Sequence, residues 1–257
     1  MNSIEHADVL NSAFAARQME QALPKARMAE ERLPFTIRVV RSEDALHKAV
    51  AIRQAAYARH VPAFAEKLRA PEDYDRAEGS VILLAESKLD GSALGTMRIQ
   101  TNRFDELTLA KSAELPAWLR AKSMAEATRL GIEVGRTGRV VKTTLFKAFY
   151  LYCVAAEIDW MVITARPPVD RQYEALMFFD LFPGQSIPMR HVNDIPHRVL
   201  AFDVRTAEAR WAAANHPLFD FVFRTHHPDL DLGAAEVSSW NSPPQSAELP
   251  SRAFAYA

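Results

Sequence analysis

Residues 123–139 have the sequence SMAEATRLGIEVGRTGR, and this stretch decides the fold of the chain. Its apolar side chains recur at even spacing, which is the pattern of a β-strand: Met124, Leu130, Ile132 and Val134. Gly135 and Gly138 then break the strand. The long, mostly apolar run 140–156 that follows predicts a buried helix, so the expected order is strand, glycine turn, helix.

The first turn of that helix is suited to an anion. The first N–H groups of a helix have no backbone partner, and the helix dipole is positive at this end. Arg136, Arg139 and Lys142 add positive charge where the dipole would favour acids. A phosphate held by these side chains and by the N–H groups around Gly138 is one interpretation, and a solvated basic turn beside a core helix is the other.

A second strand is expected at residues 159–165, directly after the helix. A strand, a helix and a strand at this spacing predict a parallel pair joined by a right-handed crossover. The two strands should therefore be neighbours or near neighbours in the sheet.

Further elements are expected on both sides of this unit. The upstream ones are a strand at 35–40, a helix from Ser42 to about residue 59, and a hairpin of strands 81–86 and 93–100 around Asp90-Gly91. The downstream ones are a helix at 171–179, strands at 186–192 and 198–204, and a helix at 206–215. The chain then divides into a helical extension (1–34), an α/β domain (35–205), a helical segment (206–232) and a tail (233–257) whose composition predicts disorder.

The composition excludes several classes of function. A chain of 257 residues with 49% hydrophobic content fits one globular domain, and a net charge of −1 provides no overall field for nucleic acid. No segment reaches the ~18 uninterrupted apolar residues that a membrane span needs. The sequence has no His-Glu-x-x-His, no paired cysteines and no Gly-x-Ser-x-Gly, so we expect neither a metal site nor a hydrolase. Cys153 has no disulfide partner and the first residues lack an export signal, which predicts a cytoplasmic protein.

Glu126 is an isolated acid on an otherwise apolar strand. Burial of a carboxylate is costly unless it is compensated, so we interpret Glu126 as a functional group. An edge or surface carboxylate is the alternative. Residues three apart on a regular strand face opposite sides, so Glu126 and Arg129 share one site only if a β-bulge lies between them.

Arginines and acids elsewhere in the chain suit an ion-pair network. Arg53 and Arg98 could pair with Asp73 and Asp75 and leave one guanidinium for a substrate carboxylate. A surface network of ion pairs is the alternative. Tyr57 follows Arg53 by one helical turn, so it either faces the same cleft or packs half-buried against the domain.

The order of elements over residues 35–205 resembles the GNAT acyltransferase superfamily. Within it, the chain resembles the N-acyl amino acid synthases and the acyl-homoserine-lactone (autoinducer) synthases. The motifs that carry this resemblance are Arg53-x-x-x-Tyr57, the acidic loop with Asp73 and Asp75, Arg98, and Glu126-x-x-Arg129. The sequences EATRL at 126–130 and YEALMFF at 173–179 are more similar to the N-acyl amino acid synthases. The resemblance implies an α/β (α+β) fold of three layers, with a mixed, mostly antiparallel, twisted sheet, helices on both faces and a bulge after Glu126.

The resemblance also implies a reaction, in which a fatty acyl group passes from acyl carrier protein to the amine of an amino acid. Glu126 and Arg129 would form the catalytic site, with Glu126 as the base. The acceptor would be bound by Arg53, Tyr57, Asp73, Asp75 and Arg98. The phosphopantetheine of the donor would be bound by Arg136, Gly138, Arg139 and Lys142, and no tightly bound cofactor or metal is expected.

Two departures from the family patterns narrow this expectation. The CoA-binding turn of GNAT enzymes, (Gln/Arg)-x-x-Gly-x-(Gly/Ala), has a small residue where the turn at 136–139 has an arginine, which favours a carrier protein over acyl-CoA as donor. Autoinducer synthases place a tryptophan near the acidic loop, and residues 61–78 contain none, which favours an amino acid over adenosylmethionine as acceptor. An autoinducer synthase and a non-catalytic GNAT-like binding module are the alternatives.

Overall fold

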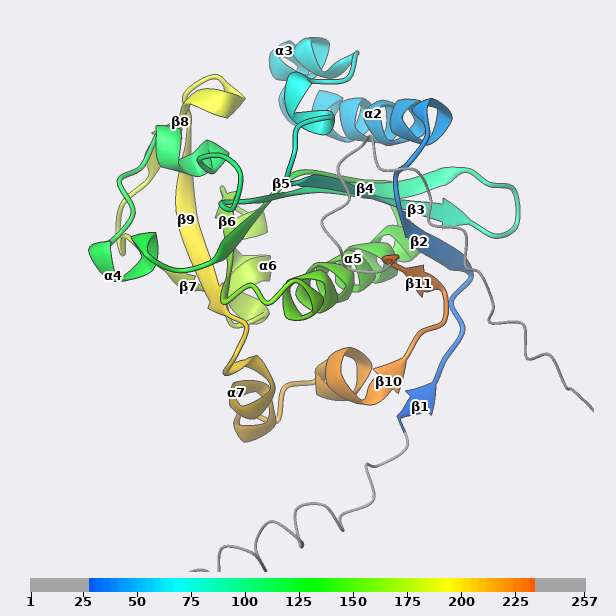
Figure 1. Ribbon diagram of the computed structural model, residues 1–257. Helices are drawn as coiled ribbons and strands as arrows, with labels where there is room; N and C mark the ends of the chain where they lie inside the picture. Colours follow the sequence, from blue (N-terminus) through cyan, green and yellow to red (C-terminus); the bar gives the residue numbers. More distant parts are fainter. Residues whose placement is uncertain (1–27, 234–257) are drawn as a thin grey trace, which may run out of the picture.

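The computed structural model describes residues 28–233, which build a twisted sheet with helices on both of its faces (Figure 1). The strands are β1 (Ala29–Glu30), β2 (Phe35–Val39), β3 (Ser80–Ser87), β4 (Ala93–Thr101), β5 (Met124–Ile132), β6 (Trp160–Ala165), β7 (Phe179–Asp180), β8 (Ile187–Met189), β9 (Ile195–Asp203), β10 (Thr225–His226) and β11 (Leu230–Asp231). The longer helices are α2 (Glu43–Ala58) and α5 (Arg136–Ala155). The shorter helical elements are α3 (Pro62–Ala65), η1 (Glu66–Leu68), η2 (Asp73–Asp75), η3 (Thr108–Lys111), α4 (Ala117–Arg120), α6 (Val169–Ala175), η4 (Arg190–Val192), α7 (Ala207–Ala213) and η5 (Asp220–Arg224).

The main sheet has the strand order β11-β2-β3-β4-β5-β6-β9-β7, with β8 paired to β9. The pairs β2–β3, β3–β4, β4–β5, β6–β9, β7–β9 and β8–β9 are antiparallel, whereas β5–β6 and β11–β2 are parallel. The sequence predictions of a mixed, mostly antiparallel sheet and of a parallel crossover through α5 are therefore confirmed.

Alternating side chains on the central strands bind a helix to each face. On β3, Leu83 belongs to the core that includes Val141 of α5, whereas its neighbour Leu84 belongs to the core that includes Leu46 of α2. Because successive side chains of a strand point to opposite faces, α2 and α5 cover opposite sides of the sheet, as Figure 1 shows. Ser42 caps α2 as expected, since its side chain accepts a hydrogen bond from the N–H of Ala45.

The parallel strands β5 and β6 separate before they end. Their pairing runs from Met124 opposite Trp160 to Ala127 opposite Ile163, and β5 then continues to Ile132 paired with β4 only. After β5 the chain turns at Gly135 into α5. The separation of the two strands positions the site described below.

The structure differs from the sequence predictions in the bounds and types of several elements. The helix expected at 171–179 ends at Ala175, because Met177 adopts a positive φ of 66° and Phe179 starts β7. The segment 206–232 contains α7 but also β11, which extends the sheet beside β2. The helices expected ahead of residue 28 and the tail after Gly233 lie outside the described residues.

Candidate active site

A β-bulge on β5 brings its two charged residues, Glu126 and Arg129, to one side. Between the pairs Thr96–Gly131 and Arg98–Thr128, β4 uses one residue and β5 uses two. Arg129 lies in this bulge with a φ of 55°. The bulge expected between Glu126 and Arg129 is confirmed, although it begins only after Thr128, and it turns Arg129 toward the face that carries Glu126 and Thr128.

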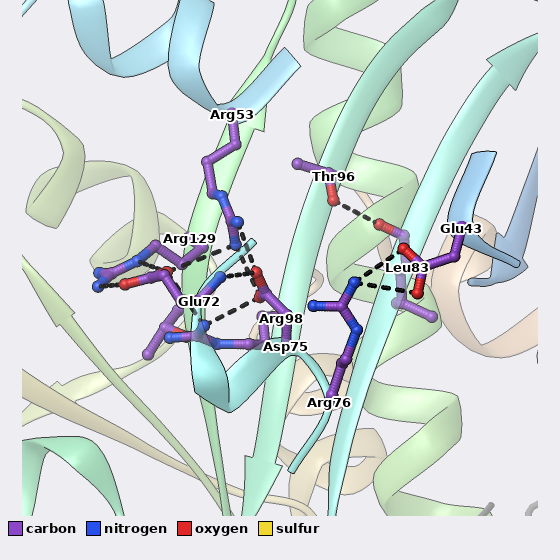
Figure 2. A network of polar contacts seen from close by, with 10 residues as sticks. Glu43, Arg53, Glu72, Asp75, Arg76, Leu83, Thr96, Arg98 and Arg129 are labelled. Carbon is purple, nitrogen blue, oxygen red and sulfur yellow. Dashed lines mark hydrogen bonds and ion pairs between the residues drawn. The ribbon is translucent and has the colours of Figure 1, made fainter. Parts of the chain in front are cut away.

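An acidic turn meets the arginines across this face (Figure 2). The guanidinium of Arg53 on α2 donates to both oxygens of Asp75, over 2.9 and 2.7 Å. Nη1 of Arg98 donates to Asp75 Oδ1 over 3.0 Å, and its Nε donates to Thr128 Oγ1 over 3.2 Å. All these side chains are buried, so this part of the predicted network is internal and not a surface pattern of ion pairs.

The second acid of the network is Glu72, which the sequence analysis did not identify. Its carboxylate accepts two hydrogen bonds of 2.7 Å from Arg129 and one of 3.1 Å from Arg98. Asp73, which was expected in this place, is exposed and outside the network of Figure 2. Residues 73–75 form a 3₁₀ turn, and side chains three apart in such a turn eclipse, so Glu72 and Asp75 share a face that Asp73 leaves. This spacing is the signal that could have identified Glu72.

The network contains more positive than negative groups. Burial would raise the pKa of Asp75, but the hydrogen bond and charge of Arg53, together with the charge of Arg98, lower it to about 2. Burial likewise opposes ionisation of Glu72, yet Arg129 and the other arginines bring its pKa below 4.5. Three guanidiniums therefore face two carboxylates. Nη2 of Arg98 and Nη1 of Arg129 are buried and have no hydrogen-bond partner in the described chain, so the network can accept a further anion.

Glu126 lies in the middle of the sheet, between Gln100 of β4 and Val162 of β6. Its side chain is fully buried, and Oε2 accepts a hydrogen bond of 3.0 Å from the N–H of Leu109, whereas Oε1 has no partner in residues 28–233. Burial raises its pKa to about 7, although the N–H of Leu109 and the charges of Arg98 and Arg129 act against this. A carboxyl group with such a pKa can take up and release a proton at neutral pH.

A cavity of about 400 Å³ opens where β5 and β6 separate. Arg129 and Thr128 of β5 lie on one wall, Tyr57 of α2 is beside them, and Thr164 of β6 and His197 of β9 also line it. Glu126 is not on the wall, but the next residue, Ala127, is. By surface area the lining is mostly apolar, as is usual for a small-molecule site, but it also includes several cationic side chains and imidazoles.

The turn between β5 and α5 is flanked by two residues that line the cavity, Ile132 and Lys142, whereas Arg136, Gly138 and Arg139 are not among the lining residues. Lys142 lines the cavity and donates a hydrogen bond to Gln172, and burial lowers its pKa. Arg136 and Arg139 are exposed, and neither guanidinium makes an ion pair with the described residues. Gly138 is buried, and a Cβ added to it would lie 2.0 Å from the carbonyl oxygen of Glu133, so there is no room for a side chain.

Lys147 has a different environment from these basic residues. It is buried on the inner side of α5, where its ammonium donates to the carbonyl oxygens of Phe221 and Thr225 and contacts Nδ1 of His227. Burial lowers its pKa to about 8. Through these contacts Lys147 fixes the C-terminal segment to α5.

His191 and His197 also line the cavity, and no sequence pattern identified them. They come from η4 and β9, which reach the cavity only through the folding of the downstream chain. The search of residues 28–233 finds no group of three or more His, Cys, Asp or Glu that could hold a metal ion. In the same residues no helix has the length and apolarity to cross a membrane.

Comparisons with known proteins identify a family and structures of similar fold. A family model described as N-acyl amino acid synthase FeeM matches residues 48–200. The structure of FeeM, an N-acyl amino acid synthase from uncultured soil microbes, superimposes with a TM-score of 0.56 at 19% identity, covering 70% of this chain and 96% of FeeM. BjaI, a CoA-dependent acyl-homoserine lactone synthase solved with SAM and isopentyl-CoA, gives a TM-score of 0.52 at 15% identity, covering 78% and 97%. No curated protein matches the chain.

Proposed function

The chain belongs to the FeeM family of N-acyl amino acid synthases, and on this premise we propose that it transfers a fatty acyl group from acyl carrier protein to an amino acid. The family makes the chain an N-acyltransferase. The identities of the donor and the acceptor are the proposal, and each is supported by a different part of the site.

The unpaired guanidinium atoms carry the proposal for the acceptor. Arg129 lines the cavity, and it and Arg98 each keep one buried N–H group without a partner in the described chain. Arg53, Arg98 and Arg129 together exceed the charge of Glu72 and Asp75 by one. The carboxylate of an amino acid supplies the missing charge and accepts both donors, which an amine without a carboxyl group cannot do.

Glu126 is the proposed base for the ammonium of the acceptor, acting directly or through a water molecule. In an α-amino acid whose carboxylate is bound by Arg98 and Arg129, the amino group is one carbon away from that carboxylate. The charges of the same two arginines act on Glu126. The pKa of about 7 matches a proton transfer at neutral pH. The bulge at Arg129 interrupts the β4–β5 ladder, and a backbone N–H freed there would bind the oxyanion of the tetrahedral intermediate.

The turn before α5 supports a donor with one phosphate. Lys142 at the cavity mouth and the exposed Arg136 and Arg139 surround the helix start near Gly138. Phosphopantetheine on a carrier protein has a single phosphate, and an acidic carrier protein would be attracted by the same charges. BjaI uses CoA-linked acyl groups, so acyl-CoA is the donor against which the carrier protein must be compared.

The test is a direct assay of product formation. The protein is incubated with fatty-acyl carrier protein and, in separate reactions, with amino acids, with the amines left when their carboxyl groups are removed, and with adenosylmethionine. Mass spectrometry identifies the products. We expect N-acyl amino acids and at least tenfold less product from the decarboxylated amines. Equal use of both kinds of amine would contradict the role of the arginines, and formation of an acyl-homoserine lactone would show that the acceptor is wrong.

A further inference from the structure

The cavity is lined by cations and imidazoles but, among the described residues, by no carboxylate. Its cationic side chains are Arg59, Arg129, Lys142 and Arg166, and its imidazoles are His60, His191 and His197. The chemistry needs a second base there. An ammonium that becomes an amide loses two protons from nitrogen, one before it attacks the thioester and one after. Glu126, which lies behind the cavity wall, is the proposed base for the first of these protons.

His197 lines the cavity and has one ring nitrogen without a partner in the described chain. It is half-buried on β9, across the opening from β5. Its Nδ1 lies 2.7 Å from the carbonyl oxygen of Ile195, and because a carbonyl oxygen only accepts hydrogen bonds, Nδ1 carries the ring proton. The neutral ring then has its lone pair on Nε2, which makes no hydrogen bond to any of the described residues.

The other imidazoles of the cavity are less suitable. Burial, the charge of Arg129 and further positive neighbours lower the pKa of His191 to about 3, which makes it a weak base. His60 is exposed at the cavity mouth. The pKa of His197 is lowered by burial and by the charge of Arg166, so this ring is unprotonated at neutral pH. Its base form is therefore present when the substrates bind.

We propose that Nε2 of His197 takes the second proton from the acceptor nitrogen and returns it to the departing sulfur. The amine nitrogen first bonds to the thioester carbon, and the π electrons of the carbonyl move to oxygen. His197 then removes a proton from the positively charged nitrogen of this adduct. The carbonyl re-forms, the C–S bond breaks with its electron pair on sulfur, and the imidazolium protonates the thiolate. This inference rests on the proposed function, because it assumes a thioester donor and an amine acceptor.

The test combines loss of the imidazole with its chemical rescue. His197→Ala removes the base and leaves space for a free imidazole, and His197→Gln removes the base but fills the space. His47→Ala, on the exposed face of α2, is the matched control. Single-turnover rates are measured with loaded donor and a saturating acceptor, with and without added imidazole. We expect both His197 variants to lose ~10²- to 10⁴-fold in rate, and only His197→Ala to recover at least tenfold with imidazole.

Each outcome has a definite meaning. Rates within twofold of the native protein in either folded His197 variant would overturn the inference, and so would an equal response to imidazole in His197→Ala, His197→Gln and His47→Ala. If His197→Ala does not fold, the loss of rate in folded His197→Gln decides the matter. Absence of any N-acyl product from the native protein would contradict the proposed function itself, so the two failures are distinguishable.

Discussion

At the residue scale, Glu126 is held in conditions that oppose its charge. The side chain is fully buried and accepts a hydrogen bond from Leu109, while Arg98 and Arg129 are close enough to influence its ionisation. Burial dominates and raises its pKa from 4.5 to about 7. An acid whose pKa is higher in the folded than in the unfolded chain stabilises the fold least when it is ionised, so this position costs stability above neutral pH.

Replacing Glu126 with Gln separates the effect of this carboxyl group on turnover from its effect on stability. We expect turnover to fall ~10²- to 10⁴-fold, because the shape is kept while the base is lost. The native protein should also lose stability relative to Glu126→Gln as pH rises from 4.5 to about 7, since the folded state holds the proton longer. The difference should approach about 3 kcal/mol, at 1.36 kcal/mol per unit of pKa shift. Denaturant unfolding across this pH range and a rate assay measure both, and a constant stability difference with unchanged turnover would refute the assignment.

The sequence predicted some members of the site much better than others. Glu126 stood out because a lone acid on an apolar strand breaks its pattern, whereas Arg129 was identified from the resemblance to the synthases. Glu72 was missed because three of the five residues at 71–75 are acidic, and only the phase of the 3₁₀ turn distinguishes the acids that face inward. His197 has no local pattern, since its place at the cavity depends on how β9 returns beside β6.

At the element scale, two close approaches hold the helices against β5. A Cβ on Gly131 would lie 2.7 Å from the Cα of Arg53, so the absence of a side chain lets α2 contact the strand. A Cβ on Gly138 would lie 2.0 Å from the carbonyl oxygen of Glu133, so the first turn of α5 depends on glycine as well. Both obstacles are backbone atoms, which cannot move without moving an element.

Alanine at these two glycines should therefore affect different substrates. Gly131→Ala displaces α2 and Arg53, so we expect a higher KM for the acceptor. Gly138→Ala displaces the start of α5, so we expect a higher KM for the donor. Each should lower the free energy of unfolding by ~1–3 kcal/mol, as overpacking does. Steady-state kinetics with each substrate varied in turn checks this, and each variant is the control for the other. Equal effects of both variants on both KM values would contradict this division.

The elements that the sequence predicted are those with strong local signals. The strand β5, its glycine turn and α5 were found because apolar periodicity and turn residues coincide over residues 123–156. The strands β7, β10 and β11 have two residues each, too few for any period, and they pair with distant segments. Tertiary contacts alone determine such strands.

At the scale of the whole molecule, charge is nearly balanced overall but not locally. The net charge is −1, whereas α5 and its preceding glycine contain four bases and no acid: Arg136, Arg139, Lys142 and Lys147. Lys147 is buried, so the outward field at the start of α5 comes from the other three. Exposed charges of this kind affect association rates more than affinity and are screened over about 8 Å at physiological salt.

Charge reversal at this helix start tests the proposed donor. The double variant Arg136→Glu, Arg139→Glu should raise the KM for acyl carrier protein at least tenfold at low salt, and much less for acyl-CoA, because only the carrier protein presents an extended acidic surface. The difference should shrink as salt rises, since screening weakens steering in the native protein. The matched control is the double variant Arg120→Glu, Lys122→Glu, which changes the net charge by the same amount. Its two residues precede β5, whereas Arg136 and Arg139 follow it. The nine residues of this strand, or roughly 30 Å, separate the two places. The measurement is KM for both donors at two salt concentrations. Equal effects on the two donors, or an equal effect of the control variant, would show that the basic turn does not select a carrier protein.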